Sequence, residues 1–328
     1  MVSLRRLRPL ALWSVAGFSC SGVALAAGSL NGAGATFPAP LYQRWFADLA
    51  ARGVARVNYQ SVGSGAGVRQ FLAGTVDFAA TDEPIKPSEA AKVRRGVVQF
   101  PAVGGTIAVA YNRPGCALKL TQKQAADVFL GSIRDWSQLN CGKGKITVVH
   151  RSDGSGTTFA FTNSLSSFSP AFKAKVGEAK SVRWPVGIGG KGNEGVASLL
   201  LNSPGSIGYV NQSYVRGKLQ AAALQNRAGR FVKPNFKTGS AALNSIRLNA
   251  DLAGEDANPS GADSYPITTL TWILAYASGN GSKAGDLRDV FLAILGPKPQ
   301  ALADDLGYVP LRGDILKKSR AAVAKIGR

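Results

Sequence analysis

A β-branched run that ends in a glycine-rich polar turn constrains this chain more than any other segment. Ile146–Val149 reads as a buried strand, the turn follows over Arg151–Thr157, and the run Phe159–Leu165 has the composition of a helix. A helix that begins in such a turn presents unpaired N–H groups and a partial positive charge, which together attract an anion. The turn adds a guanidinium and several hydroxyls, so this segment predicts an anion-binding site.

Two further turns of the same character, Gly32–Phe37 and Ser61–Gly67, lie upstream. Three such turns predict a cage for a small tetrahedral anion, although each hydroxyl alone could simply cap a helix. The expected hydroxyl donors are Thr36, Ser64, Ser155 and Thr157. The expected backbone N–H donors are those of Phe37, Ser64, Gly156 and Thr157, and Arg151 adds a planar charged fork.

Apolar runs of strand and helix character alternate along the chain, which predicts an α/β fold with a largely parallel sheet. In such sheets ligands bind beyond the carboxyl ends of strands, where the three polar turns lie. The predicted strands are Val57–Val62, Val76–Ala80, Thr106–Tyr111, Ile207–Val210 and Thr269–Tyr276. The predicted helices are Leu41–Ala51, Val68–Ala73, Thr121–Phe129, Glu194–Leu201, Leu287–Leu295 and Ile315–Ile326.

The first 27 residues have the pattern of a secretory signal peptide. Three arginines precede a mostly apolar stretch, and Ala24–Ala26 offers a small-residue cleavage pattern, with the cut after Ala26 or Ala27. The alternative is a membrane anchor, but Ser and Gly residues interrupt the apolar stretch. Cys20 lacks the preceding aliphatic residue that a lipoprotein site usually has. We therefore expect an exported, periplasmic protein.

The chain is strongly basic. Its formal charge is +20, and removal of a leader with three arginines and no acid leaves +17. Such a field attracts anions. The basic residues are scattered, however, and the longest runs are Arg94–Arg95 and Lys317–Lys318, so we expect no nucleic-acid partner.

Two cysteines, Cys116 and Cys141, remain after the leader. In an exported protein they predict a disulfide; two buried free thiols are the alternative. The chain has no C-x-x-C motif, and its single histidine is His150, so we expect no metal site.

Other chemistries fit the residues less well than binding does. The pattern after Val57–Val62 is G-x-G-x-G, in which the third glycine comes one position too early for a dinucleotide site. Hydrolysis needs an activated nucleophile, and Ser155 has no nearby base except His150, which reads as a strand residue. We expect neither a cofactor nor catalysis.

Eight motifs rich in glycine, hydroxyl or aromatic residues punctuate the chain. They are Gly32–Pro40, Val57–Gln60, Gly63–Val68, Val76–Asp82, Arg151–Thr157, Trp184–Asn193, Pro204–Val210 and Tyr265–Thr268. In combination they resemble the periplasmic phosphate-binding proteins of phosphate-specific ABC transporters, which are solute-binding proteins.

The resemblance implies a two-lobe periplasmic-binding-protein fold of type II, with the ligand in the interlobe cleft. Residues 28–103 and 266–328 would form one lobe and residues 104–265 the other. The implied phosphate ligands are Thr36, Phe37, Ser64, Asp82, Arg151, Ser155, Gly156 and Thr157. Asp153 is expected to pair with the ligand arginine and to temper its charge.

A carboxylate in an anion site makes sense if the anion carries a proton. Phosphate near neutral pH can donate a hydrogen bond to Asp82, whereas sulfate cannot, and the mismatch would cost on the order of several kcal/mol in a desolvated cleft. The alternative for Asp82 is a helix N-cap before Glu83-Pro84.

The expected function is capture of inorganic phosphate and its delivery, by a monomer, to a transmembrane ABC permease with a cytoplasmic ATPase. Two other classes stay open at this point. One is an exported phosphatase-like enzyme on the same scaffold, and the other is an extracellular protein that binds polyanions through its charge.

Overall fold

The computed structural model describes residues 29–328. The predicted signal peptide and its cleavage site near Ala26 and Ala27 lie outside the described residues. Among the helices of residues 29–328, none has the length and hydropathy that a bilayer-spanning segment needs.

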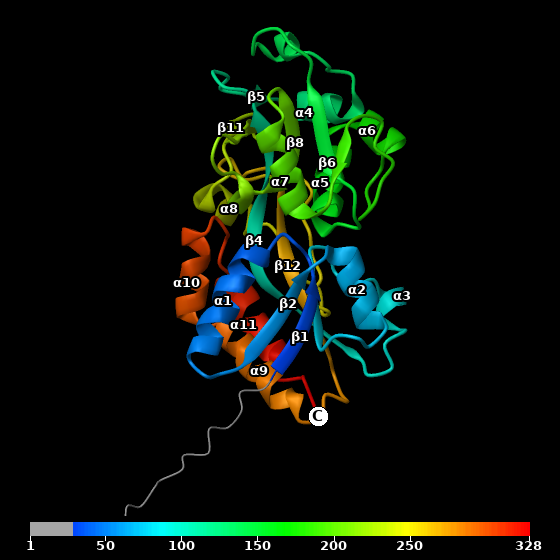
Figure 1. Cartoon of the computed structure of the whole chain (residues 1–328), viewed down its shortest axis with the longest axis vertical. Helices are drawn as coiled ribbons and strands as arrows, with labels where there is room; N and C mark the ends of the chain where they lie inside the picture. The colour runs from blue at the N-terminus through cyan, green and yellow to red at the C-terminus, as the bar shows by residue number, and fades with distance from the viewer. Residues whose placement is uncertain (1–28) are drawn as a thin grey trace, which may run out of the picture.

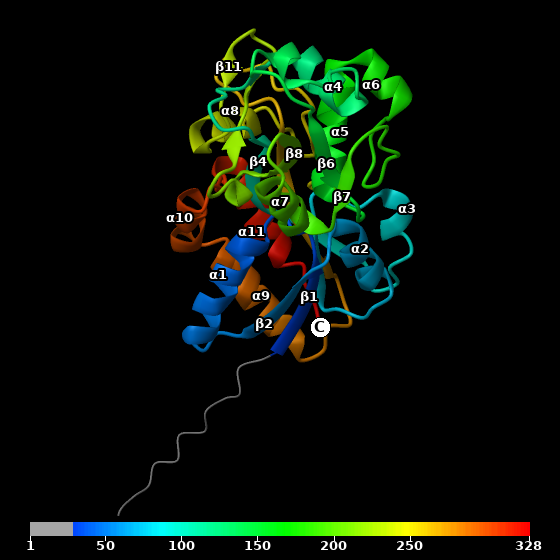
Figure 2. The same ribbon diagram turned by 45° about the horizontal axis from the view of Figure 1, so that its top comes forward.

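Two lobes are stacked along the long axis of the molecule, and the long strand β4 (Val97–Asn112) runs between them (Figures 1 and 2). The lower lobe of Figure 1 carries β1 (Ser29–Gly34) and β2 (Arg56–Ser61), and β3 (Phe78–Thr81) pairs with β1. The upper lobe carries β6 (Thr147–Arg151) and β8 (Ser206–Asn211), and β7 (Ile188–Gly190) pairs with β6. β4 pairs with β12 along residues 97–106 and with β8 along residues 107–112, so one strand serves both lobes. This arrangement is the predicted two-lobe α/β fold.

The nine-stranded sheet has the order β2-β1-β3-β12-β4-β8-β6-β7, with β9 attached to β4, and β11-β10-β5 form a small second sheet. The strands are β1 (Ser29–Gly34), β2 (Arg56–Ser61), β3 (Phe78–Thr81), β4 (Val97–Asn112), β5 (Lys119–Leu120), β6 (Thr147–Arg151), β7 (Ile188–Gly190), β8 (Ser206–Asn211), β9 (Gln220–Ala221), β10 (Ala223–Gln225), β11 (Phe231–Val232) and β12 (Thr268–Tyr276).

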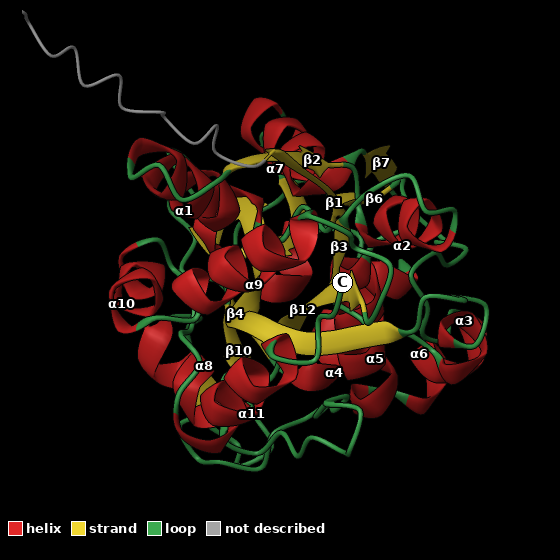
Figure 3. Cartoon of the chain, turned by 90° about the horizontal axis from the view of Figure 1, so that it is seen from below, coloured by secondary structure: helices red, strands yellow, loops and turns green. Residues whose placement is uncertain are grey.

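Helices surround the strands, as the view from below shows (Figure 3). Their buried faces follow helical spacing, as in Leu41, Trp45 and Leu49 of α1. The helices are α1 (Ala39–Ala51), α2 (Ser64–Leu72), α3 (Pro87–Ala90), α4 (Gln122–Leu130), α5 (Gly156–Phe168), α6 (Pro170–Lys175), α7 (Gly192–Asn202), α8 (Phe236–Leu243), α9 (Lys283–Ile294), α10 (Pro297–Asp305) and α11 (Gly313–Val323), with 3₁₀ turns at η1 (Trp136–Leu139) and η2 (Gln212–Tyr214).

The prediction of a largely parallel sheet is wrong, because the sheet is mixed. β1 pairs in parallel with β2 and β3, and β6 with β7 and β8. β12 is antiparallel to β3 and β4, and β4 is antiparallel to β8. The cause is the two-lobe topology: β4 leaves the lower lobe and β12 returns to it, so neighbouring strands run in opposite directions.

The predicted elements all occur, but several begin earlier than expected. β4 starts at Val97 rather than Thr106, α2 at Ser64 rather than Val68, and α9 at Lys283 rather than Leu287. The additional first half of β4 contains Pro101, which has no N–H to donate to a neighbouring strand. The structure accommodates it beside a bulge, where the register shifts between Thr271 and Trp272 of β12.

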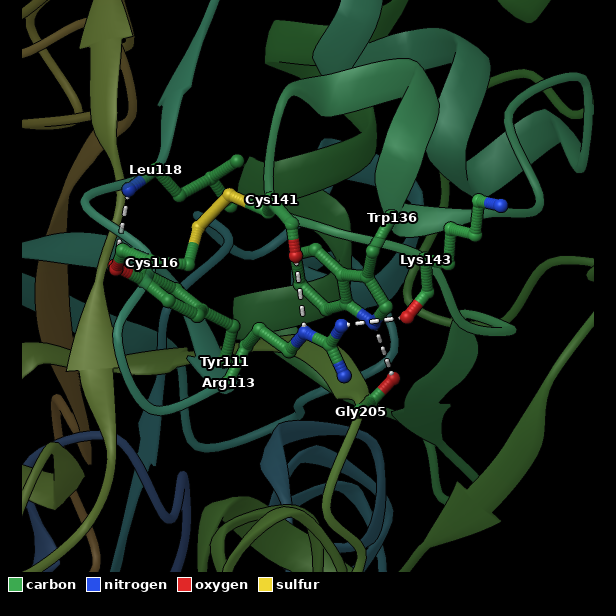
Figure 4. The surroundings of a disulfide bond; sticks show 8 residues. All are labelled: Tyr111, Arg113, Cys116, Leu118, Trp136, Cys141, Lys143 and Gly205. Carbon is green, nitrogen blue, oxygen red and sulfur yellow. Dashed lines mark hydrogen bonds between the residues drawn. A yellow bond between two sulfur atoms is a disulfide. The ribbon is translucent and has the colours of Figure 1, made fainter.

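Cys116 and Cys141 form the predicted disulfide, with their Cα atoms 5.2 Å apart (Figure 4). The surrounding loops are tied by hydrogen bonds as well. The Tyr111 hydroxyl donates to the Cys116 carbonyl (2.7 Å), and Arg113 Nε donates to the Cys141 carbonyl (3.1 Å). The bond therefore closes a 25-residue loop that contains α4 and η1.

We predict that the double variant Cys116→Ser/Cys141→Ser is less stable than the wild type by about 2–4 kcal/mol, because its unfolded chain regains the entropy of an open loop. Urea unfolding measures the difference. The wild-type protein with its leader removed, unfolded without reductant, should show no titratable thiol; two reactive thiols would contradict the disulfide.

Candidate functional site

The starts of α2 and α5 meet where the two lobes touch. The Gly65 N–H of the lower lobe donates to the Gly154 carbonyl of the upper lobe at 2.8 Å. A Cβ placed on Gly156 would lie 2.7 Å from the Asp82 Cβ and from Ser64 Oγ. Only glycine fits there, so two of the three predicted turns, together with Asp82, come directly together.

The N-terminus of α5 keeps two N–H groups unpaired. Ser155 is the N-cap, and its Oγ accepts from the Thr158 N–H at 3.0 Å. The N–H groups of Gly156 and Thr157 find no acceptor within residues 29–328. The N–H groups of Phe37 and Ser64, which belong to the other two turns, are likewise unpaired within that range. Four backbone donors are therefore left for a ligand.

Arg151 lies at the end of β6 and is held by Asp153. Its Nε donates to Asp153 Oδ1 (2.8 Å) and its Nη2 to Oδ2 (2.6 Å), and the Gly192 N–H also donates to Oδ1 (3.0 Å). Burial raises the pKa of Asp153, but the bonds and charge of Arg151 outweigh this and lower it. The Arg151 side chain is 1% exposed, and its Nη1 finds no acceptor in the described chain. This bidentate pair of hydrogen bonds fixes the orientation of the guanidinium and leaves Nη1 available to a ligand.

Asp82 follows β3 and is buried. Thr271 Oγ1 donates to its Oδ1 (2.7 Å), and Thr157 Oγ1 donates to its Oδ2 (3.3 Å). Burial raises the pKa of Asp82 to about 7, although these bonds and the charge of Arg151 act in the opposite direction. Asp82 does not cap α3, which begins at Pro87. The helix-cap alternative for Asp82 is therefore wrong.

Three buried hydroxyls are fixed as acceptors on their protein side. Thr36 Oγ1 accepts from both the backbone N–H (3.0 Å) and Nδ2 (2.8 Å) of Asn193, and Ser64 Oγ accepts from the Asp82 N–H (3.3 Å). Ser155 Oγ accepts from Thr158, as described above. Each hydroxyl keeps one hydrogen, and none of the three donates it to another group in residues 29–328. Three O–H donors therefore join the unpaired N–H groups.

Phe37 contributes its backbone rather than its ring. The Phe37 carbonyl accepts from the Tyr308 hydroxyl at 2.8 Å, and its ring packs against β4 at Gly105. Tyr308 thus holds the end of the turn Gly32–Phe37 in place through its backbone.

The sequence interpretation missed two residues that order the site. Asn193, at the start of α7, joins Thr36 to Thr157, and its Oδ1 accepts from the Asn211 N–H. Thr271 lies in the middle of β12. Asn193 ends a motif that the sequence analysis singled out, so a signal existed; nothing local marks Thr271, because only the β12–β3 pairing brings it to Asp82.

Interlobe contacts border the site. Glu83 in the lower lobe is buried, and its Oε2 lies 2.7 Å from Lys180 Nζ of the upper lobe. Glu194 Oε1, in α7, accepts from Ser61 Oγ and from the Tyr214 hydroxyl, both at 3.0 Å. The structure therefore represents a closed form, in which the two lobes contact each other.

The arrangement suits binding of an oxyanion better than catalysis. His150 lies in β6 and stacks on Trp184 with ring centroids 5.3 Å apart, and burial lowers its pKa. Its Nδ1 lies 3.1 Å from the Arg151 carbonyl, so it is engaged beside the strand rather than with Ser155. Within residues 29–328 no three His, Cys, Asp or Glu side chains form a cluster that could hold a metal ion.

Comparisons with known proteins agree with this geometry. Residues 21–293 match the family model of the PBP superfamily domain. The chain is 41% identical to the phosphate-binding protein PstS of Xylella fastidiosa, over 89% of this chain and 84% of that protein. It is 39% identical to the phosphate-binding protein PstS of Pasteurella multocida, over 93% and 92%.

A solved structure has the same fold. The high-affinity periplasmic phosphate-binding protein PfluDING, bound with phosphate, superposes with a TM-score of 0.73 at 23% identity, over 89% of this chain and 93% of that one. The family model and the curated relatives each cover most of the sequence. This chain therefore belongs to the PBP superfamily and, within it, to the family of the phosphate-binding protein PstS.

Proposed function

We propose that this chain captures inorganic phosphate between its two lobes and delivers it to an ABC permease. The observation that carries the proposal is the convergence of one carboxylate with buried donors that have no acceptor in the part of the chain that the structure describes. A tetrahedral oxyanion satisfies such donors from several directions at once. The names of the relatives, which are binding proteins, support the same function.

In this proposal each predicted residue has a defined role. Arg151 Nη1 donates to a phosphate oxygen, while Asp153 neutralises and orients the guanidinium. The hydroxyls donate the hydrogens that the protein leaves unused. The phosphate ligands are Thr36, Phe37, Ser64, Asp82, Arg151, Ser155, Gly156 and Thr157.

Asp82 supplies the preference for phosphate over sulfate. Both its oxygens already accept one hydroxyl hydrogen. A protonated phosphate oxygen can donate a third hydrogen bond to Asp82. A sulfate oxygen carries no hydrogen, so it would face the ionised Asp82 carboxylate with two acceptors and no donor between them. The unpaired contact is unfavourable because burial removes the water that would otherwise compensate it.

Closure of the lobes completes the site. We infer that residues 28–103 with 266–328 move against residues 104–265, through rotation at β4 and at the segment before β12. These two crossing segments lie side by side, since the Ile107 N–H donates to the Ile267 carbonyl at 2.9 Å. The Glu83–Lys180 pair spans the closing lobes, so it holds the closed form.

The setting of the protein follows from the same proposal. The leader of residues 1–27 exports a monomer to the periplasm, where it meets the transmembrane permease. The ATPase of that permease lies on the cytoplasmic side. The exported protein turns over no substrate, because Ser155 has no base positioned to activate it. A chromogenic phosphate ester should therefore release no product above background.

We predict that the purified protein binds phosphate and arsenate in a one-to-one ratio and sulfate much more weakly. Arg151→Ala should weaken phosphate binding by at least about 2 kcal/mol, because it removes a buried charge and orphans Asp153. Isothermal titration calorimetry measures both. Arg94→Ala, which removes an exposed arginine, is the matched control. Near-native affinity of Arg151→Ala would contradict the proposed cage.

We predict that discrimination against sulfate weakens as the pH falls below about 7. Asp82 has a raised pKa in the closed protein, so it is protonated below that pH and can then donate to sulfate. Sulfate affinity should rise as the pH falls from 8 towards 5, by at most about tenfold per unit because one proton is taken up. In Asp82→Asn the rise should be absent and the selectivity reduced. An unchanged selectivity at all pH values would refute the role of Asp82.

We predict that Lys180→Met weakens phosphate binding by about 2 kcal/mol through faster release, because closure then buries the Glu83 charge without its partner. Lys86→Met is the control: Lys86 Nζ lies 3.6 Å from the same carboxylate but belongs to the same lobe and is exposed. Stopped-flow release of phosphate separates the two variants. Equal release rates in both would show that the interlobe pair does not hold the closed form.

A further inference from the structure

A pocket lies away from the proposed phosphate site, beside the strand that crosses between the lobes. It has a volume of about 720 Å³ and lies between residues 236–248, which include α8, and residues 309–318, which include the start of α11. This volume is within the range of sites that hold small organic ligands.

The pocket lies on the opposite face of β4 from the phosphate site. A Cβ on Gly105 would meet the ring of Phe37, whose Cζ lies 2.8 Å away, whereas a Cβ on Gly104 would meet the side chain of Leu243. Adjacent residues of a strand point to opposite faces. Phe37 belongs to the phosphate site and Leu243 lines the pocket, so the crossing strand separates the two.

The lining combines an apolar floor with a basic rim. Leu243, Ile246, Val309 and Leu311 are buried side chains of the floor. The rim carries four cations, which are Lys237, Arg247, Arg312 and Lys318. Among the described residues that line the pocket, Asp314 is the one acid, and it pairs with Lys318 at 2.7 Å.

Three of the four cations have no carboxylate partner within the described chain. Arg247 is engaged by a backbone carbonyl, since its Nη1 donates to the Asn244 oxygen at 2.6 Å. Lys237 is exposed at the start of α8. The Arg312 guanidinium lies 5.2 Å from the centre of the Phe236 ring, which places a charge directly above an aromatic wall. A ligand that covers the floor would therefore bring its polar end to these groups.

We propose that this pocket binds a small amphiphilic anion, with one carboxylate or sulfonate and an apolar body the size of a medium-chain fatty acid. The charged end would lie between Lys237 and Arg312, and the apolar body would cover the floor. An inorganic anion would leave the floor exposed, and a neutral amphiphile would leave the rim without its counter-charge.

The pocket is built from both lobes, because α8 lies beside the upper lobe and α11 in the lower lobe (Figure 1). In the structure the lobes are closed on the face that holds the proposed phosphate site, where the Gly65 N–H donates to the Gly154 carbonyl. Rotation about β4 that opens this face would bring α8 towards α11 and narrow the pocket. An occupant of the pocket thus favours the closed form. Each ligand then raises the affinity of the protein for the other ligand by the same factor. This coupling rests on the proposed phosphate function.

Decanoate tests the pocket directly, by isothermal titration calorimetry in phosphate-free buffer below its micelle concentration. We expect one site, at least fivefold weaker binding in Lys237→Gln/Arg312→Gln, and unchanged binding in the control Lys173→Gln/Lys175→Gln, which removes two exposed charges from α6. Ser240→Trp, which fills the pocket from α8, should also abolish binding. Equal binding of decanol, no decanoate binding, or full binding by the double pocket variant would overturn the proposal.

The coupling has its own readout. Saturating decanoate should tighten phosphate binding at least about fivefold, and this gain should vanish in Lys237→Gln/Arg312→Gln. Unchanged phosphate affinity would overturn the coupling. Failure of the protein to bind phosphate even without decanoate would instead refute the proposed function, and the decanoate titration would still decide the pocket.

Discussion

Near the interface between the two lobes lie buried hydrogen-bond donors for which residues 29–328 offer no acceptor. Proteins rarely leave such groups unpaired, because each costs about 1–3 kcal/mol once water is removed. Here the groups belong to separate turns, yet all are at or near one interface, with Arg151 Nη1 among them. The simplest way to satisfy this set together is an oxyanion, and the architecture follows from the need to bring the turns together.

The crossing strand β4 links this interface to the rest of the molecule. It pairs with β12 in one lobe and with β8 in the other. In the proposed mechanism the lobes rotate about this strand, the Glu83–Lys180 pair holds them closed on one face, and the basic pocket on the opposite face changes shape. The same strand would then connect phosphate capture, phosphate retention and the proposed second ligand.

Much of this was accessible from the sequence. Arg151, Ser155 and Thr157 lie in one local strand-to-helix turn, where short-range rules apply. The two cysteines that remain after the leader of an exported chain indicated the disulfide. The contacts of Asn193 and Thr271 were not accessible, because they depend on pairing between distant segments. The mixed sheet escaped prediction for the same reason: alternating strands and helices do not reveal that the chain crosses between lobes and returns.

The most direct test of the central claim is a crystal structure of the protein with phosphate. The account predicts one phosphate whose oxygens lie within hydrogen-bond distance of Arg151 Nη1, of the Gly156 and Thr157 nitrogens and of the Ser64 hydroxyl, with Asp82 facing its protonated oxygen. A phosphate bound elsewhere, or a bound phosphate that leaves Arg151 Nη1 without a contact, would contradict it.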